Sequence, residues 1–206
     1  MKKKTRNILL SILIGAFLLC AIVGGTVYYY LFAPQFHPSK TVYVYIDRDD
    51  TADSIYNKIR QTGHVNQFTG FLWMAKYKKL NQNIHTGRYA IRPNDNVYHV
   101  FSRLSRGYQE PINLTIGSVR TLDRLARSVG KQLMIDSAEI ARHLFDSTFQ
   151  AEMGYTPITM ACLFIPETYQ VYWDMSVDDF FKRMQTEHQR FWNNERLARA
   201  TAIGMT

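Results

Sequence analysis

The chain has 206 residues and a formal net charge of +8, with 46% hydrophobic and 20% charged residues. This balance excludes a wholly disordered chain, and the low count of two cysteines excludes a disulfide scaffold. Four of the basic residues lie within the first six positions, namely Lys2, Lys3, Lys4 and Arg6. Half of the net charge therefore lies in this short tail, and no nucleic-acid partner is expected.

A long apolar segment follows this basic tail. Residues 7–39 contain no Asp, Glu, Lys or Arg, and the apolar residues 8–32 end in the triplet Tyr28-Tyr29-Tyr30. As an α-helix rising ~1.5 Å per residue, this segment is long enough to cross a ~30 Å hydrocarbon core. It is longer than the apolar region of a cleaved signal peptide. The sequence therefore predicts a single-pass transmembrane helix in the cytoplasmic (inner) membrane, with residues 1–7 in the cytoplasm and residues 33–206 outside it, in the periplasm where there is one.

The first part of the exported chain is expected to be a module of strands and helices. Residues 33–40 are expected to be a linker, and residues 41–110 to form the module. Hydrophobic periodicity predicts strands over residues 41–46 and 87–91, and helices over residues 51–61, 67–80 and 94–104. Gly63 and Gly107 occupy positions where helices are expected to end.

Residues 111–206 continue the mixture of strands and helices. Ile112, Leu114 and Ile116 alternate like a strand, and a helix is expected over residues 121–131. The remaining expectations are a helix opened by Asp136 and Glu139 as a capping box, a single long helix over residues 178–200, and a buried Cys162. The predicted fold class is α+β.

Motifs for nucleotide, zinc or nucleophile chemistry are absent from the sequence. It has no phosphate-binding loop, no H-E-x-x-H, no C-x-x-C and no G-x-S-x-G, and its six histidines show no ligand spacing. We therefore expect no cofactor and no metal site.

One segment, residues 163–173, differs from ordinary packing because a proline and a carboxylate interrupt an apolar and aromatic run. Pro166 is expected to form a turn that presents Glu167. Tyr169, Tyr172 and Trp173 offer flat rings and polar groups to a sugar. The residues alone leave a second interpretation open, in which a strand is followed by a turn and the carboxylate caps a neighbouring helix.

With these features the chain resembles the YceG-like family, the endolytic murein (lytic) transglycosylases. The matching features are the anchor, the strand Val44-Tyr45-Ile46 with its following helix, and residues 86–107, similar to the family's "GxYxIxPG…L…G" stretch. The most specific match is Leu163 to Tyr169, similar to "EGxLFPDTY". Ala161-Cys162 stand where Glu-Gly is usual, and Glu167 where Asp or Asn is usual.

The resemblance implies a domain organisation and a reaction. Residues 41–110 would be a LysM-like module, and residues 111–206 the beginning of a mixed α/β catalytic domain. The partners implied are peptidoglycan glycan strands, the membrane through residues 8–32, and cell-wall synthesis proteins. In the family, one glutamic acid protonates the oxygen of the MurNAc–GlcNAc bond, and the muramic acid's 6-hydroxyl then closes a 1,6-anhydro ring. Because that nucleophile is intramolecular, proximity replaces the second carboxylate of other glycosidases.

The resemblance also implies where the site residues lie. The family's catalytic glutamate lies in a helix downstream of the Pro-x-Thr-Tyr motif. Since no matching helix follows Tyr169, this residue is expected beyond Thr206, with Glu167 as a weaker candidate. Pro166, Glu167, Thr168 and Tyr169 are expected to bind the glycan. The alternative function is that of a non-enzymatic, membrane-tethered glycan-binding or scaffold protein.

Overall fold

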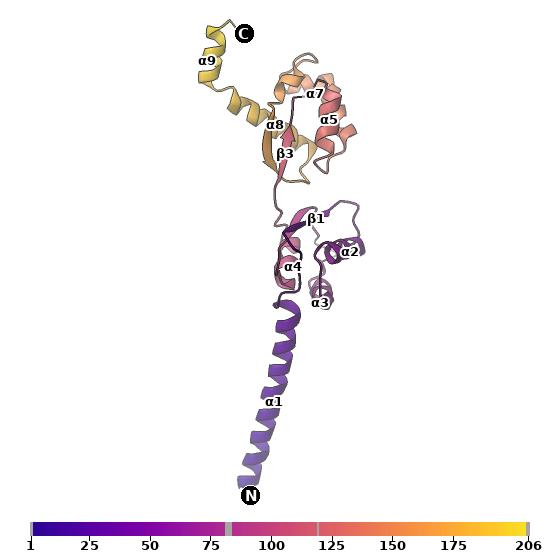
Figure 1. Cartoon of the computed structure of the whole chain (residues 1–206), viewed down its shortest axis with the longest axis vertical. Helices are drawn as coiled ribbons and strands as arrows, with labels where there is room; N and C mark the ends of the chain where they lie inside the picture. Colours follow the sequence, from indigo (N-terminus) through magenta and orange to yellow (C-terminus); the bar gives the residue numbers. More distant parts are fainter. Residues whose placement is uncertain (1, 81–83, 119, 205–206) are drawn as a thin grey trace. The chain divides into compact units, whose positions relative to one another are not determined.

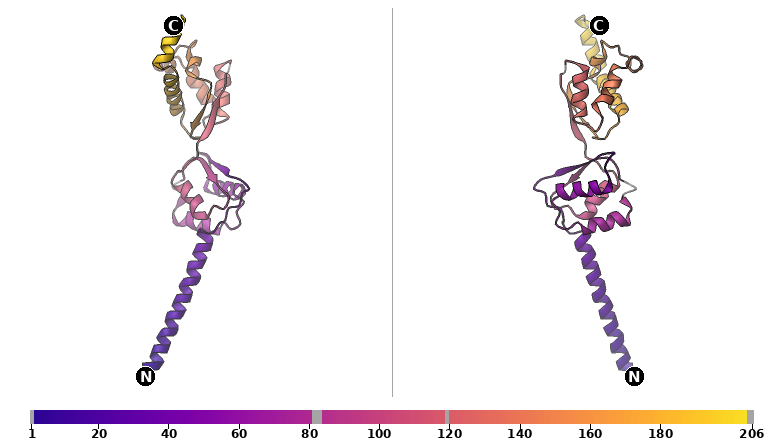
Figure 2. Two further views of the ribbon diagram at one scale, coloured as in Figure 1. Left: turned by 60° about the vertical axis from the view of Figure 1, so that its left-hand side comes forward. Right: turned by 90° about the vertical axis from the view of Figure 1, so that its right-hand side faces the viewer.

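The computed structural model describes residues 2–80, 84–118 and 120–204. The chain divides into two compact units, unit 1 with residues 1–109 and unit 2 with residues 110–206. Figure 1 and Figure 2 colour both units along the chain. Each unit combines helices with a two-stranded antiparallel sheet, so the α+β class is confirmed.

Unit 1 begins with the long apolar helix that the sequence predicts. α1 covers Lys2–Leu31 and runs as one straight helix in every view (Figure 1, Figure 2). Its segment Ile8–Leu31 is long and apolar enough to cross a membrane, and the residues from Ile8 to Tyr29 are exposed. Such a continuous apolar surface is rare on a protein surrounded by water.

The rest of unit 1 contains the predicted strands and helices in the predicted order. They are β1 (Val42–Ile46), α2 (Ala52–Thr62), α3 (Thr69–Tyr77), β2 (Gly87–Ile91) and α4 (Val97–Ser105). β1 pairs with β2, and Val44 lies opposite Tyr89. Thr51 and Asn96 start α2 and α4, because their side-chain oxygens accept hydrogen bonds from the third amide of each helix. α3 is shorter than the predicted 67–80.

Two contacts in unit 1 differ from the expectations. Gly63 ends α2 with a φ of −80°, so a left-handed conformation is not the reason for this glycine. A Cβ atom there would lie 2.7 Å from a ring carbon of Phe36, so the glycine allows close packing instead. Phe36 itself is fully buried. The segment 33–40, expected to be a linker, therefore contributes to the core of unit 1.

Unit 2 is built around the pair of β3 and β4. Its elements are β3 (Ile112–Ile116), α5 (Leu122–Gly130), α6 (Ser137–Phe145), α7 (Ser147–Glu152), the 3-10 helix η2 (Met160–Leu163), β4 (Glu167–Val171), α8 (Val177–Phe191) and α9 (Asn194–Ala202). The inward side chains of both strands pack with α5, α6 and α8 around Phe180 and Phe181. Asp136 caps α6 as expected, accepting a hydrogen bond from the amide of Ala138.

Two predictions for unit 2 are wrong. The long helix over residues 178–200 is two helices, since Trp192 leaves the helical conformation with a ψ of 59° and Asn193 caps α9. A capping side chain that bonds a new helix start competes with continuation of the old helix. Cys162 is exposed rather than buried, because it lies on the outer side of η2 while Met160 and Leu163 occupy the core.

The carboxylate of Asp50 leads to a pH-dependent prediction for unit 1. Burial alone would raise its pKa, but hydrogen bonds from the amide of Asp47, from Lys58 and from Ser54 outweigh it and lower the pKa below the ordinary 3.8. Since the folded pKa is the lower one, the stabilisation is present above about pH 4 and is lost as the pH falls through the folded pKa.

We therefore expect the free energy of unfolding of unit 1 to fall less steeply between about pH 5 and pH 2 in Asp50→Asn than in the unmodified chain. Hydrogen exchange of the β1–β2 amides at several pH values measures this. Asp49→Asn is the matched control, because it removes the same charge from an exposed neighbour. Parallel pH profiles for Asp50→Asn and the unmodified chain would contradict the prediction.

Candidate functional site

The segment that the sequence singled out crosses from η2 into β4. Leu163 and Phe164 are buried, Pro166 lies exposed at a bend, and β4 begins at Glu167. The expected turn at Pro166 is therefore present as a bend before a strand. The alternative left open by the sequence was a strand followed by a turn. The structure has the opposite order, with the bend first and the strand after it.

Glu167 has an exposed side chain at the first position of β4. Its Oε1 atom accepts a hydrogen bond from the amide of Thr168 at 3.0 Å. A general acid that is protonated near neutral pH needs partial burial, as in the glutamic acid of lysozyme, which is the standard example. Glu167 lacks that burial, so its position favours contact with a ligand over proton donation.

Tyr169 points into the core of unit 2. Its residue is 6% exposed, and its hydroxyl donates a hydrogen bond to the carbonyl oxygen of Ile165 at 2.7 Å. Burial raises the pKa of Tyr169, and the charges of Glu187 and Glu167 raise it further. The tyrosine therefore holds the bend before β4 in place, and its ring is not presented to solvent.

The pairing of β3 with β4 brings polar side chains together on the opposite face. Thr115 lies opposite Thr168, with their Oγ1 atoms 3.1 Å apart, and Asn113 lies opposite Gln170. The side-chain amide of Gln132 bonds both the N–H and the C=O of Thr115, each at 3.0 Å. The backbone of Thr115 thus points away from β4, which is the arrangement that brings paired side chains closest.

The exposed residues on this side of the sheet form what we call the β3–β4 polar face. Its members are Asn113, Thr115, Thr168, Gln170 and Tyr172. Amide and hydroxyl groups both donate and accept hydrogen bonds, and an exposed tyrosine adds an amphipathic ring. Such a surface suits a neutral polyhydroxylated ligand better than an ion.

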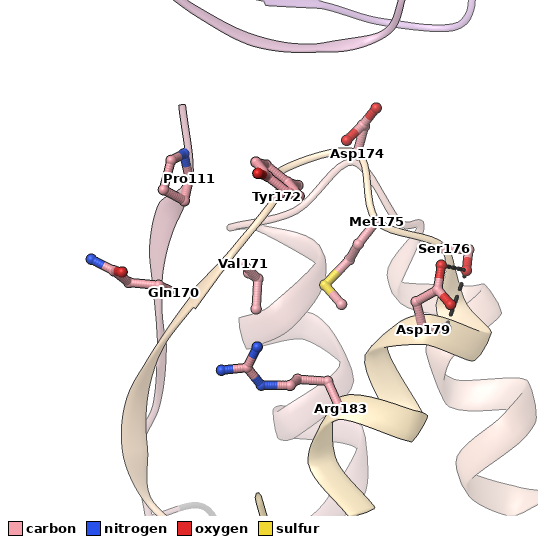
Figure 3. A pocket seen from close by; sticks show the side chains of 9 residues that line it. All are labelled: Pro111, Gln170, Val171, Tyr172, Asp174, Met175, Ser176, Asp179 and Arg183. Atoms are coloured by element: carbon pink, nitrogen blue, oxygen red, sulfur yellow. Dashed lines mark hydrogen bonds between the residues drawn. The ribbon is translucent and has the colours of Figure 1, made fainter. Parts of the chain in front are cut away.

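A cavity of about 730 Å³ lies at the end of β4 beside the start of α8 (Figure 3). Gln170 and Tyr172 of the polar face line it, together with Arg183. In Figure 3 the side chain of Arg183 extends from α8 toward β4, below Val171. The Nε atom of Arg183 lies 2.8 Å from Glu187 as an ion pair, although this buried nitrogen makes no hydrogen bond within the part of the chain that the structure describes.

A smaller cavity of about 280 Å³ lies beside the motif itself. Ala161, Phe164 and Pro166 line it together with Arg120 and Thr121. Position 161 is one of those where this chain departs from the family pattern, and its side chain is exposed there. Among the residues that the structure describes, no group of three or more His, Cys, Asp or Glu side chains could hold a metal ion.

The structure thus separates the four predicted site residues. Pro166, Glu167 and Thr168 are exposed, whereas Tyr169 is buried. Asn113 and Thr115 were missed as site residues, although the alternation of Ile112, Leu114 and Ile116 already places them on the other face of the strand. The contribution of Gln132 has no signal in the sequence.

Comparison with known proteins identifies the family. The profile of the YceG-like family matches residues 44–206, and no curated protein matches the chain. The crystal structure of a protein from Listeria monocytogenes that is described as YceG-like is similar, with 19% identity and a TM-score of 0.43. That match covers 82% of this chain and 60% of the Listeria chain, so this chain spans less than two thirds of that protein. Because the family profile matches most of the sequence, the chain belongs to the YceG-like family.

Proposed function

We propose that the protein is a membrane-anchored lytic transglycosylase of peptidoglycan, and that the β3–β4 polar face binds its glycan strand. The observation that carries this proposal is the family match over residues 44–206, which includes the motif from Leu163 to Tyr169. The apolar helix α1 supports a single-pass anchor. The basic residues before it favour a cytoplasmic N-terminus, with both units outside the cytoplasm.

The reaction cleaves the bond between MurNAc and GlcNAc. A carboxylic acid donates its proton to the glycosidic oxygen as the C1–O bond breaks. The muramic acid's 6-hydroxyl oxygen then bonds to C1 and returns its proton to the carboxylate, which closes the 1,6-anhydro ring. No water or cofactor takes part. We assign the acid to a family glutamate that follows the motif, because the exposed Glu167 lacks the burial that such an acid needs.

The geometry of unit 2 suits the binding part of this reaction. Thr168 and Gln170 present a hydroxyl and an amide beside the ring of Tyr172, which is 56% exposed. The hydroxyl groups of a glycan strand are uncharged. The hydroxyl of Thr168 and the amide of Gln170 can therefore form hydrogen bonds with several of them at once. In unit 1, we propose that residues 41–110, with α2 and α3 between the paired strands β1 and β2, form the LysM-like module.

The binding role is tested by comparing two tyrosines of the same strand region. We expect Tyr172→Ala to raise the Kd for purified glycan strands about tenfold, because truncating an exposed aromatic contact at the centre of a binding surface costs over ~1 kcal/mol. Tyr169→Phe is the matched control, since it removes a hydroxyl that bonds only inside the protein. It should leave the Kd unchanged while lowering stability by about 1 kcal/mol.

Co-sedimentation of the detergent-solubilised chain with glycan strands gives both Kd values. A larger loss of binding for Tyr169→Phe than for Tyr172→Ala would place the glycan elsewhere.

The reaction itself is tested with protein made from the complete reading frame, by mass spectrometry of the products. Anhydro-muropeptide ends that persist in Glu167→Gln support our assignment, whereas their loss in that variant makes Glu167 the acid. Binding without any product supports a non-enzymatic glycan-binding protein.

A further inference from the structure

The last turn of α1 is bonded directly to the rest of unit 1. The side chain of Gln35, a residue only 2% exposed, donates from Nε2 to the carbonyl oxygen of Tyr29 at 2.9 Å. The Nδ2 atom of Asn96 donates to the carbonyl oxygen of Phe32 at 3.3 Å. Carbonyl groups at a helix end lack partners within the helix, and here unit 1 supplies them. The junction is therefore packed rather than flexible.

α3 passes against this last turn at the level of Tyr30. A Cβ atom on Gly70 would lie only 2.2 Å from the carbonyl oxygen of Tyr30, so the absent side chain lets the two helices touch. The rings of Trp73 and Tyr30 lie 5.6 Å apart. Figure 1 accordingly shows α3 beside the end of α1, while β1 lies on the far side of unit 1.

The length of α1 places this contact at the edge of the hydrocarbon. From Ile8 to Tyr30 the helix advances about 33 Å at 1.5 Å per residue, compared with a core of about 30 Å. If Ile8 enters the hydrocarbon on one side, Tyr30 leaves it on the other. Since α3 touches Tyr30, α3 lies at the depth of the lipid headgroups.

The side chains on the outward side of α3 match that depth. This α3 outer face consists of Leu72, Trp73, Lys76 and Tyr77, and the three apolar or aromatic residues are 45%, 56% and 81% exposed. The helix instead buries Phe71 and Ala75. Trp and Tyr concentrate at membrane interfaces, and a lysine among them can extend its ammonium group to the headgroups.

The charge around the α3 outer face is positive. Residues 54–94 contain no Asp or Glu, and within them Lys76, Lys78 and Lys79 follow one another along α3 and its end. The ammonium group of Lys78 lies 5.4 Å from the centre of the Tyr77 ring, so charge and aromatic surface are adjacent. Anionic phospholipid attracts basic residues that lie close to its surface.

We propose that the α3 outer face inserts into the headgroup region of the membrane that α1 spans, and that it binds anionic phospholipid there. Unit 1 is then held at the membrane surface by two contacts, the transmembrane helix and an interfacial helix. The inference rests on the proposed anchoring by α1, and it adds a second membrane-binding site.

The test measures the depth of Trp73 in the full chain reconstituted into vesicles of phosphatidylcholine and phosphatidylglycerol. Trp173→Phe and Trp192→Phe together leave Trp73 as the single tryptophan. We expect a nitroxide at the lipid headgroup to quench Trp73 at least about two-fold more than a nitroxide at carbon 12 of the acyl chain. The matched control moves the tryptophan to β1 through Trp73→Phe and Tyr45→Trp, and it should show little quenching by either label.

Vesicle flotation separates the two hypotheses. A chain that fails to float contradicts the anchoring by α1. A chain that floats with Trp73 unquenched overturns the interfacial contact alone, and this is also the result expected if a partner protein covers the α3 outer face. Changing Lys76, Lys78 and Lys79 to Glu replaces three positive charges by negative ones, which anionic lipid repels. This variant should lower the headgroup quenching of Trp73 at least about two-fold. Unchanged quenching in this variant would overturn the preference for anionic lipid.

Discussion

Replacing Asp95 by Ala is expected to lower the free energy of unfolding of unit 1 by about 3–5 kcal/mol, the cost of breaking a buried ion pair. Both carboxylate oxygens of Asp95 bond the guanidinium of Arg103, and Oδ2 also accepts from the amide of Arg92 at 2.7 Å. Asp95 is buried, and the guanidinium also donates to the carbonyl oxygen of Ala90. Without Asp95, Arg103 keeps a largely buried positive charge that lacks its counter-ion.

The matched control is Asp123→Ala, which removes the same kind of pair from the surface. Asp123 bonds Arg127 one helical turn away, and both side chains are at least half exposed. Exposed pairs contribute about 0–1 kcal/mol, so this variant should unfold almost like the unmodified chain. Hydrogen exchange of the β1–β2 amides for Asp95→Ala, and of the α5 amides for Asp123→Ala, measures both losses. Losses of similar size would show that the Asp95–Arg103 pair is open to solvent.

Phe180→Ala should have an equally large effect on unit 2, about 3–5 kcal/mol, because it deletes a large side chain from a closed core. Phe180 is fully buried on α8, with its ring centre 5.3 Å from that of Phe181 and 6.0 Å from that of Phe164. Phe164 belongs to the family motif. The cavity left by Phe180→Ala should therefore also loosen the bend at Pro166 and the start of β4.

Hydrogen exchange of the β3–β4 amides measures this loss, and glycan binding should weaken with it. Phe145→Ala is the matched control, since its ring is 60% exposed at the end of α6. That variant should cost less than about 0.5 kcal/mol, the usual range for surface substitutions. If the two phenylalanine variants lose the same free energy, the core described around Phe180 is wrong.

The elements found correctly from the sequence have strong local signals. The strands at Val42 and Gly87 and the helices after Thr51 and Thr121 combine a clear periodicity with a capping residue or a flanking glycine. The break at Asn193 was missed because the apolar stripe continues past it, and a capping side chain can start a new helix at such a point.

The site was only partly predictable for a related reason. Tyr169 and Tyr172 were both expected to face a sugar, yet their positions differ by three, and on an extended chain residues that differ by an odd number point to opposite sides. Along β4, Tyr169 and Val171 are buried, whereas Thr168 and Gln170 are exposed. Periodicity could have shown that the two rings diverge, but which ring is buried depends on packing with helices such as α5 and α6, which are distant from β4 in the sequence.

The sequence by itself determined a helix long and apolar enough to cross a membrane, the α+β class and the family, because length, composition and short motifs are properties of consecutive residues. Only the tertiary structure decided that residues 33–40 are a packed junction, with Phe36 buried against Gly63 and Gln35 bonded to Tyr29. It also placed α3 at the level of Tyr30. The physical reason is that burial and depth depend on contacts between residues that are distant along the chain, and such contacts leave no local pattern.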